Sequence, residues 1–72
     1  MRYGPDYNKE IECCRKAIEL APKYATPWNN MGTAYYHLGN CQKAVECFRK
    51  AVELEPGDKA FQRNLEIAKE EL

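Results

Sequence analysis

The sequence has no excess of either charge sign, because eleven lysines and arginines balance eleven aspartates and glutamates. Proteins that bind nucleic acids or membrane surfaces in general carry a basic excess, so we expect neither partner. No apolar run approaches the roughly 20 residues that span a bilayer. No apolar segment of the signal-peptide type follows Met1 to Pro5, which we expect to fray at the end of the chain.

Cysteine is present, but it lacks the spacing of a disulfide or zinc framework. Cys13 and Cys14 are neighbours in a helical pattern and point about 100° apart. A structural zinc site needs four ligands in a compact spacing, such as paired C-x-x-C motifs, and this chain has none. Two disulfides remain an alternative, but we favour reduced thiols and a cytoplasmic location. Cys41, beside a predicted turn, is expected to be the most exposed thiol, and Cys47 to be a core or near-core residue.

Histidine is scarce, since His37 is the one histidine in the chain. His37 and Cys41 form an H-x₃-C pair, but two ligands do not make a metal site. A Cys–His nucleophile also requires an orienting third group and an oxyanion site, and no motif here supplies them. We therefore expect no enzyme activity, no metal and no cofactor, and we interpret His37 as a solvated side chain.

Alternating β-branched runs, which are typical of strands, are also absent. Apolar residues instead recur at helical spacing along four segments. The predicted helices cover residues 7–21, Thr26 to Leu38, Cys41 to Leu54, and 59–72. Helices joined by turns of a few residues pack antiparallel to their neighbours. The sequence therefore predicts an all-α fold of four helices in a single domain, residues 1–72.

Residues at the ends of the predicted helices agree with these boundaries. Asp6, Asn40 and Asp58 can each accept hydrogen bonds from the first-turn amides of the helix that follows. Thr26 can cap the second helix in the same way, and Gly39 can end it in the left-handed conformation. The expected core residues are Tyr7, Ile11, Cys14, Ala17, Ile18 and Ala21, then Trp28, Met31, Tyr35 and Leu38, then Ala44, Val45, Phe48, Ala51, Val52 and Leu54, and finally Phe61, Leu65, Ala68 and Leu72.

Two stretches of the chain repeat one another. The segment IECCRKAIELAP begins at Ile11, and VECFRKAVELEP begins 34 residues later at Val45. The motif W-x₂-L-G-x₂-Y…A-x₃-F…P is matched, with methionine in place of leucine, by Trp28, Met31, Gly32, Tyr35, Ala44, Phe48, Ala51 and Pro56. The sequence thus resembles the tetratricopeptide repeat, with one full repeat over residues 25–58.

The resemblance implies a helix-turn-helix fragment of an α-solenoid. Residues 7–21 resemble the second helix of a preceding repeat, and residues 59–72 resemble the capping helix that ends such arrays. Glu10 stands where the family has a small residue, which we interpret as a position without a nested helix. Glu66 and Lys69 stand at positions that would receive a following helix, so we expect this face of the capping helix to meet water.

Gly32 interrupts a predicted helix, where glycine costs about 1 kcal/mol relative to alanine. We interpret it as the point where another helix approaches too closely for a Cβ atom. Ala44 is the matching small residue that we expect to face it.

The function that the resemblance implies is a non-enzymatic scaffold, which holds a peptide or protein segment in a groove lined by the first helix of each repeat. Asparagine amides suit an extended backbone, a tyrosine suits an apolar anchor, and an arginine suits a carboxylate. Some members of the family bind the C-terminal carboxylate of chaperones with a clamp of basic and amide side chains. In this chain Ala60 and Asn64 stand at two positions where that clamp has basic residues, so we do not expect this kind of binding. The alternative is that these are ordinary solvated residues. The predicted binding residues are Thr26, Asn29, Asn30, Thr33, Tyr36, His37, Arg63 and Ile67.

Self-association is a second hypothesis for the function. Repeat arrays need about three units for stability, and this chain has fewer. The first helix is therefore expected to keep Ile11, Cys14 and Ile18 only partly covered. We expect marginal monomer stability or a homo-oligomer through this apolar face. The default oligomer is a symmetric dimer, and one form of it exchanges helices between the two copies.

Overall fold

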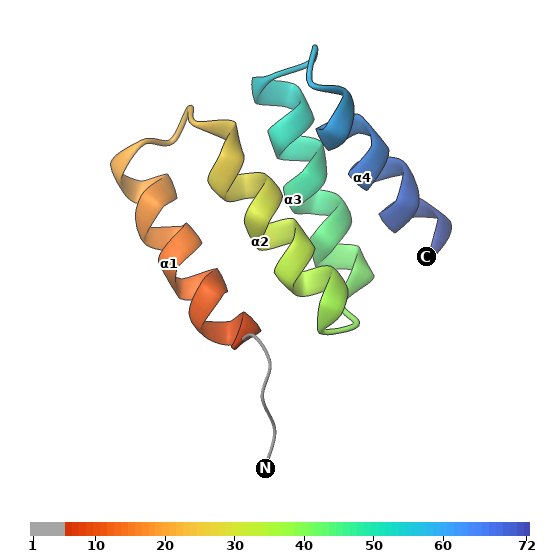
Figure 1. Ribbon diagram of the computed structural model, residues 1–72, viewed down its shortest axis with the longest axis horizontal. Coiled ribbons are helices and arrows are strands. Elements are labelled where there is room, and N and C mark those ends of the chain that lie inside the picture. Colours follow the sequence, from red (N-terminus) through yellow and green to blue (C-terminus); the bar gives the residue numbers. More distant parts are fainter. Residues whose placement is uncertain (1–5) are drawn as a thin grey trace.

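The computed structural model describes residues 6–72, which form four helices and contain no strand. The helices are α1 (Tyr7–Leu20), α2 (Ala25–His37), α3 (Cys41–Leu54) and α4 (Lys59–Glu70). Each runs antiparallel to its neighbour along the chain (Figure 1). The predicted all-α fold and its four helices are confirmed, whereas the prediction that Met1 to Pro5 frays lies outside the described residues.

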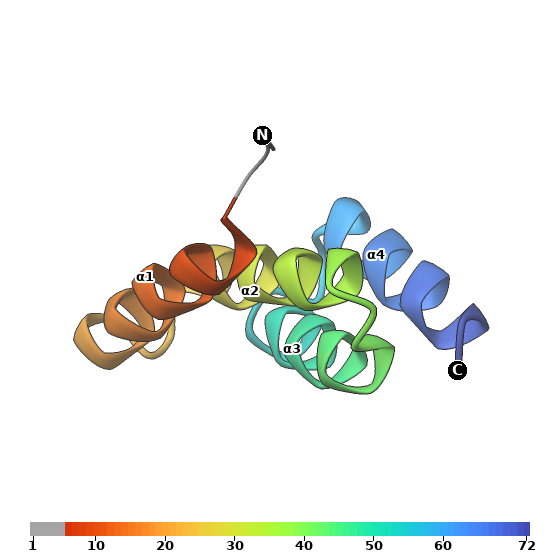
Figure 2. The ribbon, with the colours of Figure 1, turned by 90° about the horizontal axis from the view of Figure 1, so that it is seen from below.

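The arrangement of the helices follows chain order. α2 packs against α1 and α3, and α4 packs against α3 and touches α2. Seen along the helices, α3 lies beneath α2, with α1 on one side and α4 on the other (Figure 2). α1 and α4 therefore form the two opposite edges of the molecule.

Three of the four predicted helix caps are confirmed. Asp6, Asn40 and Asp58 each accept a hydrogen bond from the backbone N–H three residues later, at 3.2, 3.2 and 3.1 Å. The prediction for Thr26 is wrong, because α2 begins at Ala25 with Tyr24 as a cap that makes no side-chain bond. Ala25 is fully buried in one cluster with the α3 and α4 side chains, so packing holds this end of the helix in place of a side-chain cap.

The turn between α2 and α3 depends on Gly39, whose φ of 87° lies in the left-handed region as predicted. The N–H of Gly39 donates to the carbonyl of Tyr36 at 3.0 Å, and the N–H of Asn40 donates to the carbonyl of Tyr35 at 2.9 Å. This pair of bonds is the Schellman arrangement, which satisfies carbonyls that the end of a helix leaves without partners.

Gly32 marks a close approach of α2 and α3, as expected, and the atoms nearest to it belong to Phe48 and Cys47. A Cβ atom on Gly32 would lie 2.7 Å from two ring atoms of Phe48 and 3.2 Å from Cβ of Cys47. Ala44, the predicted neighbour, is buried in a cluster with Phe48 against which Tyr35 packs. The antiparallel register therefore places an aromatic ring directly against Gly32.

Burial along the helices corrects four further expectations. Ala21, the residue that follows α1, is exposed and does not belong to the core. Ile11 on α1 is 6% exposed and so is well covered, although Cys14 and Ile18 remain half-buried as predicted. Leu38 is 46% exposed and Leu72 is 70% exposed, so neither belongs to the core. Both leucines follow the last residue of their helices, where the helical stripe no longer directs a side chain inward.

Candidate functional site

A hollow of about 200 Å³ lies between α2 and α4. Its floor is the ring of Phe48, which is buried, and its α4 wall carries Ile67, which is 42% exposed. The residues that line it are Thr33, Tyr36, His37, Phe48, Asn64 and Ile67. The structure therefore brings together four of the predicted binding residues and adds two, Phe48 and Asn64, that were not predicted for the site.

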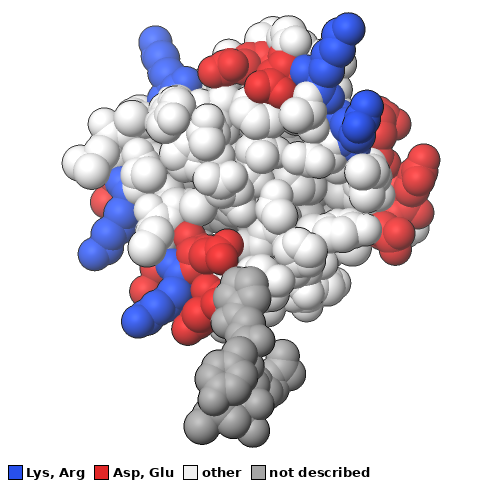
Figure 3. Space-filling model, in the orientation of Figure 1, with Lys and Arg blue, Asp and Glu red and all other residues white. Residues whose placement is uncertain are grey.

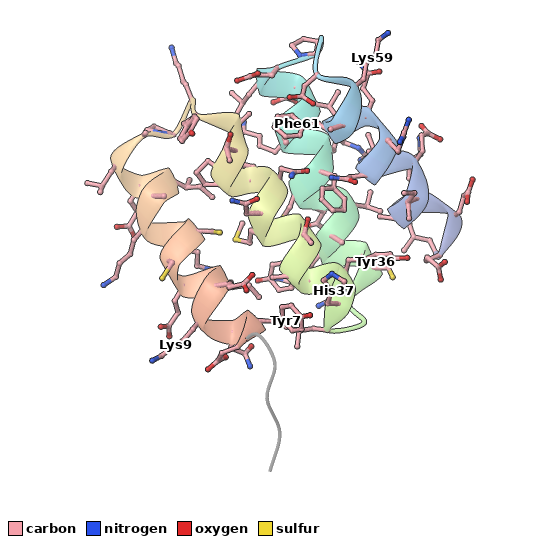
Figure 4. The ribbon with its side chains drawn as sticks, viewed as in Figure 1. Tyr7, Lys9, Tyr36, His37, Lys59 and Phe61 are labelled. Atoms are coloured by element: carbon pink, nitrogen blue, oxygen red, sulfur yellow. The ribbon has the colours of Figure 1, made fainter. Side chains whose placement is uncertain are left out.

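The helical spacing explains why these side chains converge. Thr33, Tyr36 and His37 are three and four residues apart, so they share one face of α2. Asn64 and Ile67 are three residues apart on the facing side of α4. Tyr36 and His37 lie at the C-terminal end of α2 (Figure 4).

The face that contains this hollow has little charge. α2 contains no Lys, Arg, Asp or Glu. The middle of the face is free of charged residues, which lie mainly around its rim (Figure 3). The site can therefore offer apolar contact and neutral hydrogen bonds, but it has no cluster of charges for an acidic or basic ligand.

A hydrogen bond between α2 and α4 holds the site in shape. The side-chain amide of Asn64 donates to Oδ1 of Asn29 at 2.9 Å, and Oγ1 of Thr33 donates to the backbone carbonyl of Asn29 at 3.1 Å. Asn29 was expected to offer its whole amide to a ligand, but its side-chain oxygen is engaged within the chain. Within residues 6–72, the Nδ2 group of Asn29 and the carbonyl oxygen of Asn64 make no hydrogen bond to another side chain, so both remain suited to binding.

Aromatic rings close one end of the hollow. The ring of His37 is stacked on that of Tyr7 of α1, with 5.1 Å between centroids and 18° between planes. The ring of Tyr36 meets His37 edge-on, with 6.0 Å between centroids. His37 is exposed, as expected, but it is held by two rings, so the interpretation of a freely solvated side chain was incomplete.

The other predicted binding residues do not line this hollow. Thr26 is half-buried in the first turn of α2, and Arg63 is exposed on α4. Asn30 is exposed and lines a different hollow, between α1 and α2. The eight predicted residues are thus divided among several surfaces, and the α2–α4 hollow gathers half of them.

The four cysteines are free thiols and differ in exposure. Cys13 is exposed and Cys41 is half-buried, so the expectation that Cys41 is the most exposed thiol is wrong. Cys47 is buried, as expected, and burial together with the neighbouring Glu46 carboxylate raises the pKa of its thiol to about 11. Burial, with smaller contributions from Glu10 and Cys13, also raises the pKa of the Cys14 thiol.

These exposures predict an order of alkylation. At pH 8, iodoacetamide should modify Cys13 first and Cys47 last, because about one Cys47 in a thousand is then ionised and its sulfur is buried. We expect the rates for these two thiols to differ at least a hundredfold in the folded chain, and peptide mass spectrometry measures them. In 6 M guanidinium the difference should largely vanish, and an equal rate under native conditions would contradict the packing described for α3.

Within residues 6–72, no three His, Cys, Asp or Glu side chains come together in a way that could hold a metal ion. His37 and Cys41 lie on opposite sides of the α2–α3 turn and gain no third ligand among the described residues. No helix in the described part of the chain is long and apolar enough to cross a membrane.

Antiparallel helices that pack in chain order and repeat their core positions define a helical-repeat protein. Sequence profiles of the tetratricopeptide repeat match residues 25–58 and residues 6–24. The chain belongs to the tetratricopeptide repeat family. Such repeats are in general protein–protein interaction modules and are usually non-catalytic. No individual curated protein matches the chain.

Proposed function

We propose that this chain is a protein-interaction module that binds an extended, uncharged segment of a partner protein in the hollow between α2 and α4. The observation that carries the proposal is the convergence of Thr33, Tyr36, His37 and Ile67 on one hollow with an apolar floor. The family gives the general role, and the chemistry of this hollow supports the kind of segment.

The hollow suits one apolar side chain of the partner. Ile67 and the ring of Phe48 supply apolar area, and the ring of Tyr36 adds a flat contact with a polar tip. The Nδ2 group of Asn29 and the carbonyl oxygen of Asn64 can bond the backbone on either side of that side chain. Because α2 has no charged residue, affinity should come from apolar burial and neutral hydrogen bonds.

The test is a selection from a displayed library of short random peptides, followed by fluorescence anisotropy with the selected peptides. Ile67→Glu should weaken binding at least tenfold, because it places a carboxylate beside an apolar side chain without a partner charge. Tyr36→Ala should weaken binding by a similar factor, because it removes an aromatic anchor. Raising NaCl from about 50 to about 500 mM should change Kd less than threefold.

One exposed residue of α4 serves as a control, and a second one tests the extent of the bound segment. Lys59→Ala, at the start of the helix, should leave Kd within twofold of the original value. Arg63→Ala tests whether the bound segment also extends over the wider face predicted from the sequence. If the selection yields no peptide, or if the selected peptides bind the Ile67→Glu and Tyr36→Ala variants as well as the original chain, this function is wrong.

A further inference from the structure

A second hollow, of about 400 Å³, lies between α1 and α2. The residues that line it are Lys9, Glu10, Cys13, Cys14, Asn30 and Thr33. This surface is not part of the α2–α4 hollow, although Thr33 borders both. No side chain of α3 or α4 lines it.

The internal repeat identifies what fits this surface. Moving each lining residue 34 positions along the chain gives Lys43, Ala44, Cys47, Phe48, Asn64 and Ile67. These counterparts are residues that surround α2 in the structure. Cys47 and Phe48 flank Gly32, Lys43 lies 5.9 Å from the ring centroid of Tyr35, and Asn64 bonds Asn29. The α1–α2 hollow is therefore the counterpart of the surface on which α2 itself lies.

The helix that corresponds to α2 one repeat later is α4. In the register of α2 and α3, Gly32 is level with Phe48, and Tyr35, one turn on, packs against the cluster that contains Ala44. Shifting the α2 residues forward by 34 gives Glu66 and Lys69 on α4. Shifting the α3 residues back by 34 gives Cys14 and Glu10 on α1.

The residues paired by this shift are complementary in charge and in size. When α4 is placed on α1 in the register that α2 has on α3, Lys69 lies opposite Glu10. A cation then meets an anion where the internal repeat has Tyr35 and Ala44. Glu66 falls opposite Cys14, so a longer side chain meets a smaller one where the internal repeat has Gly32 and Phe48.

The contact between α2 and α4 has a counterpart as well. Asn29 shifted forward by 34 residues is Arg63, and Asn64 shifted back by 34 is Asn30. The counterpart of the Asn29–Asn64 bond is therefore a contact between Arg63 and Asn30, in which the guanidinium can donate to the amide oxygen. Arg63 and Asn30 were predicted as binding residues from the sequence, and both are exposed outside the α2–α4 hollow.

We propose that copies of this chain associate head to tail, with α4 of one copy lying in the α1–α2 hollow of the next. Lys69 and Glu66 are exposed on α4, with side chains 47% and 67% exposed, so this face is open to a second copy. α1 and α4 form opposite edges of the molecule (Figure 1), so each copy offers one hollow and one inserting helix. Such a contact is heterologous, so it builds chains or rings of copies and not a symmetric dimer. It does not depend on the α2–α4 hollow and is separate from the proposed function.

Sedimentation velocity of the purified chain, from about 5 µM to about 1 mM, tests the association. The average mass should rise with concentration and pass that of a dimer. Glu10→Lys alone and Lys69→Glu alone should each raise the midpoint concentration about tenfold, because each places like charges opposite one another. The double variant restores opposite charges and should return the midpoint to within about threefold of the original.

Glu46→Lys is the matched control, because Glu46 lies on α3 beside a surface shared with α1 and α2 of its own chain. It should leave the midpoint within twofold. Circular dichroism at about 5 µM checks that every variant is folded, which is expected since Glu10 and Lys69 are exposed.

Alkylation gives an independent readout of the same contact. As concentration rises, the rate for Cys13 should fall severalfold because α4 of the preceding copy covers it, while the rate for Cys41 of α3 should not change. A chain that is monomeric at 1 mM, an association that stops at the dimer, or a double variant that stays as weak as the single ones would each overturn the proposal.

Discussion

Replacing Gly32 with leucine is expected to remove most of the stability of the chain at 25 °C. Its Cβ would lie 2.7 Å from two ring atoms of Phe48, and that ring is only 3% exposed and cannot move into solvent. Overpacking of this kind costs about 1–3 kcal/mol, and leucine adds three further carbons beyond Cβ. A domain of this size rarely has more than about 3–5 kcal/mol of stability in total. Urea denaturation followed by circular dichroism measures the loss.

Alanine substitutions at Gly32 and Gly57 distinguish the effect of crowding from the general effect of replacing a glycine. Gly32→Ala gains about 1 kcal/mol of helix propensity but meets the same two ring atoms, so we expect a net loss below about 2 kcal/mol. Combining it with Phe48→Leu should give a smaller loss than the two single changes predict. Gly57→Ala meets no heavy atom within 4 Å and should stabilise the chain by about 0.4–1 kcal/mol. A Gly32→Leu variant with an unchanged melting curve would refute the packing of α2 on α3.

Local features of the fold could be predicted because they depend on short stretches of sequence. Asp6, Asn40 and Asp58 cap their helices through side chains that reach the backbone three residues on. Gly39 adopts the left-handed conformation that side chains disfavour. Such signals do not depend on how the helices pack, so the four helices and the repeat could be read from the residues alone.

Contacts between helices could not be predicted as well. Spacing along a helix indicates which residues share a face, but it does not determine which turn of the neighbouring helix lies opposite. The sequence indicated that a helix approaches Gly32 closely, but it did not indicate that the nearest atoms belong to Phe48 and Cys47. Thr26 is a good cap by residue type, but burial of Ala25 extends α2 by one residue at that end. Tertiary packing overrides local preference at that end of α2.

The candidate site shows the same division. Tyr36 and Ile67 were predicted for it because the family resemblance maps them to the groove lined by the first helix of each repeat. Phe48 and Asn64 were assigned elsewhere, since the sequence pattern marks Phe48 as core and does not reveal that Asn64 lies beside Asn29. The 34-residue offset between Asn30 and Asn64 was the available signal, because it places Asn64 on the first helix of the next repeat.

Truncating Phe48 to alanine should have the other large effect on stability. The ring packs in one cluster with Ala44, Val45 and Ala68, and it lies against Gly32. It therefore joins α2, α3 and α4, and its removal leaves a cavity between three helices. Phe→Ala changes in protein cores cost about 3–5 kcal/mol, which is comparable to the whole stability expected for a domain of this size. We expect loss of most of the helical signal at 25 °C in circular dichroism.

Two further variants keep this result interpretable when Phe48→Ala does not fold. Phe48→Leu should remain folded and lose about 1–2 kcal/mol, because leucine fills part of the same volume. Tyr24→Ala removes an aromatic ring that is 55% exposed and should change stability by less than about 0.5 kcal/mol. Phe48 also forms the floor of the α2–α4 hollow, so the folded Phe48→Leu variant should accept bulkier apolar side chains in a repeated peptide selection. A loss below about 1 kcal/mol for Phe48→Ala would show that the ring does not join the three helices.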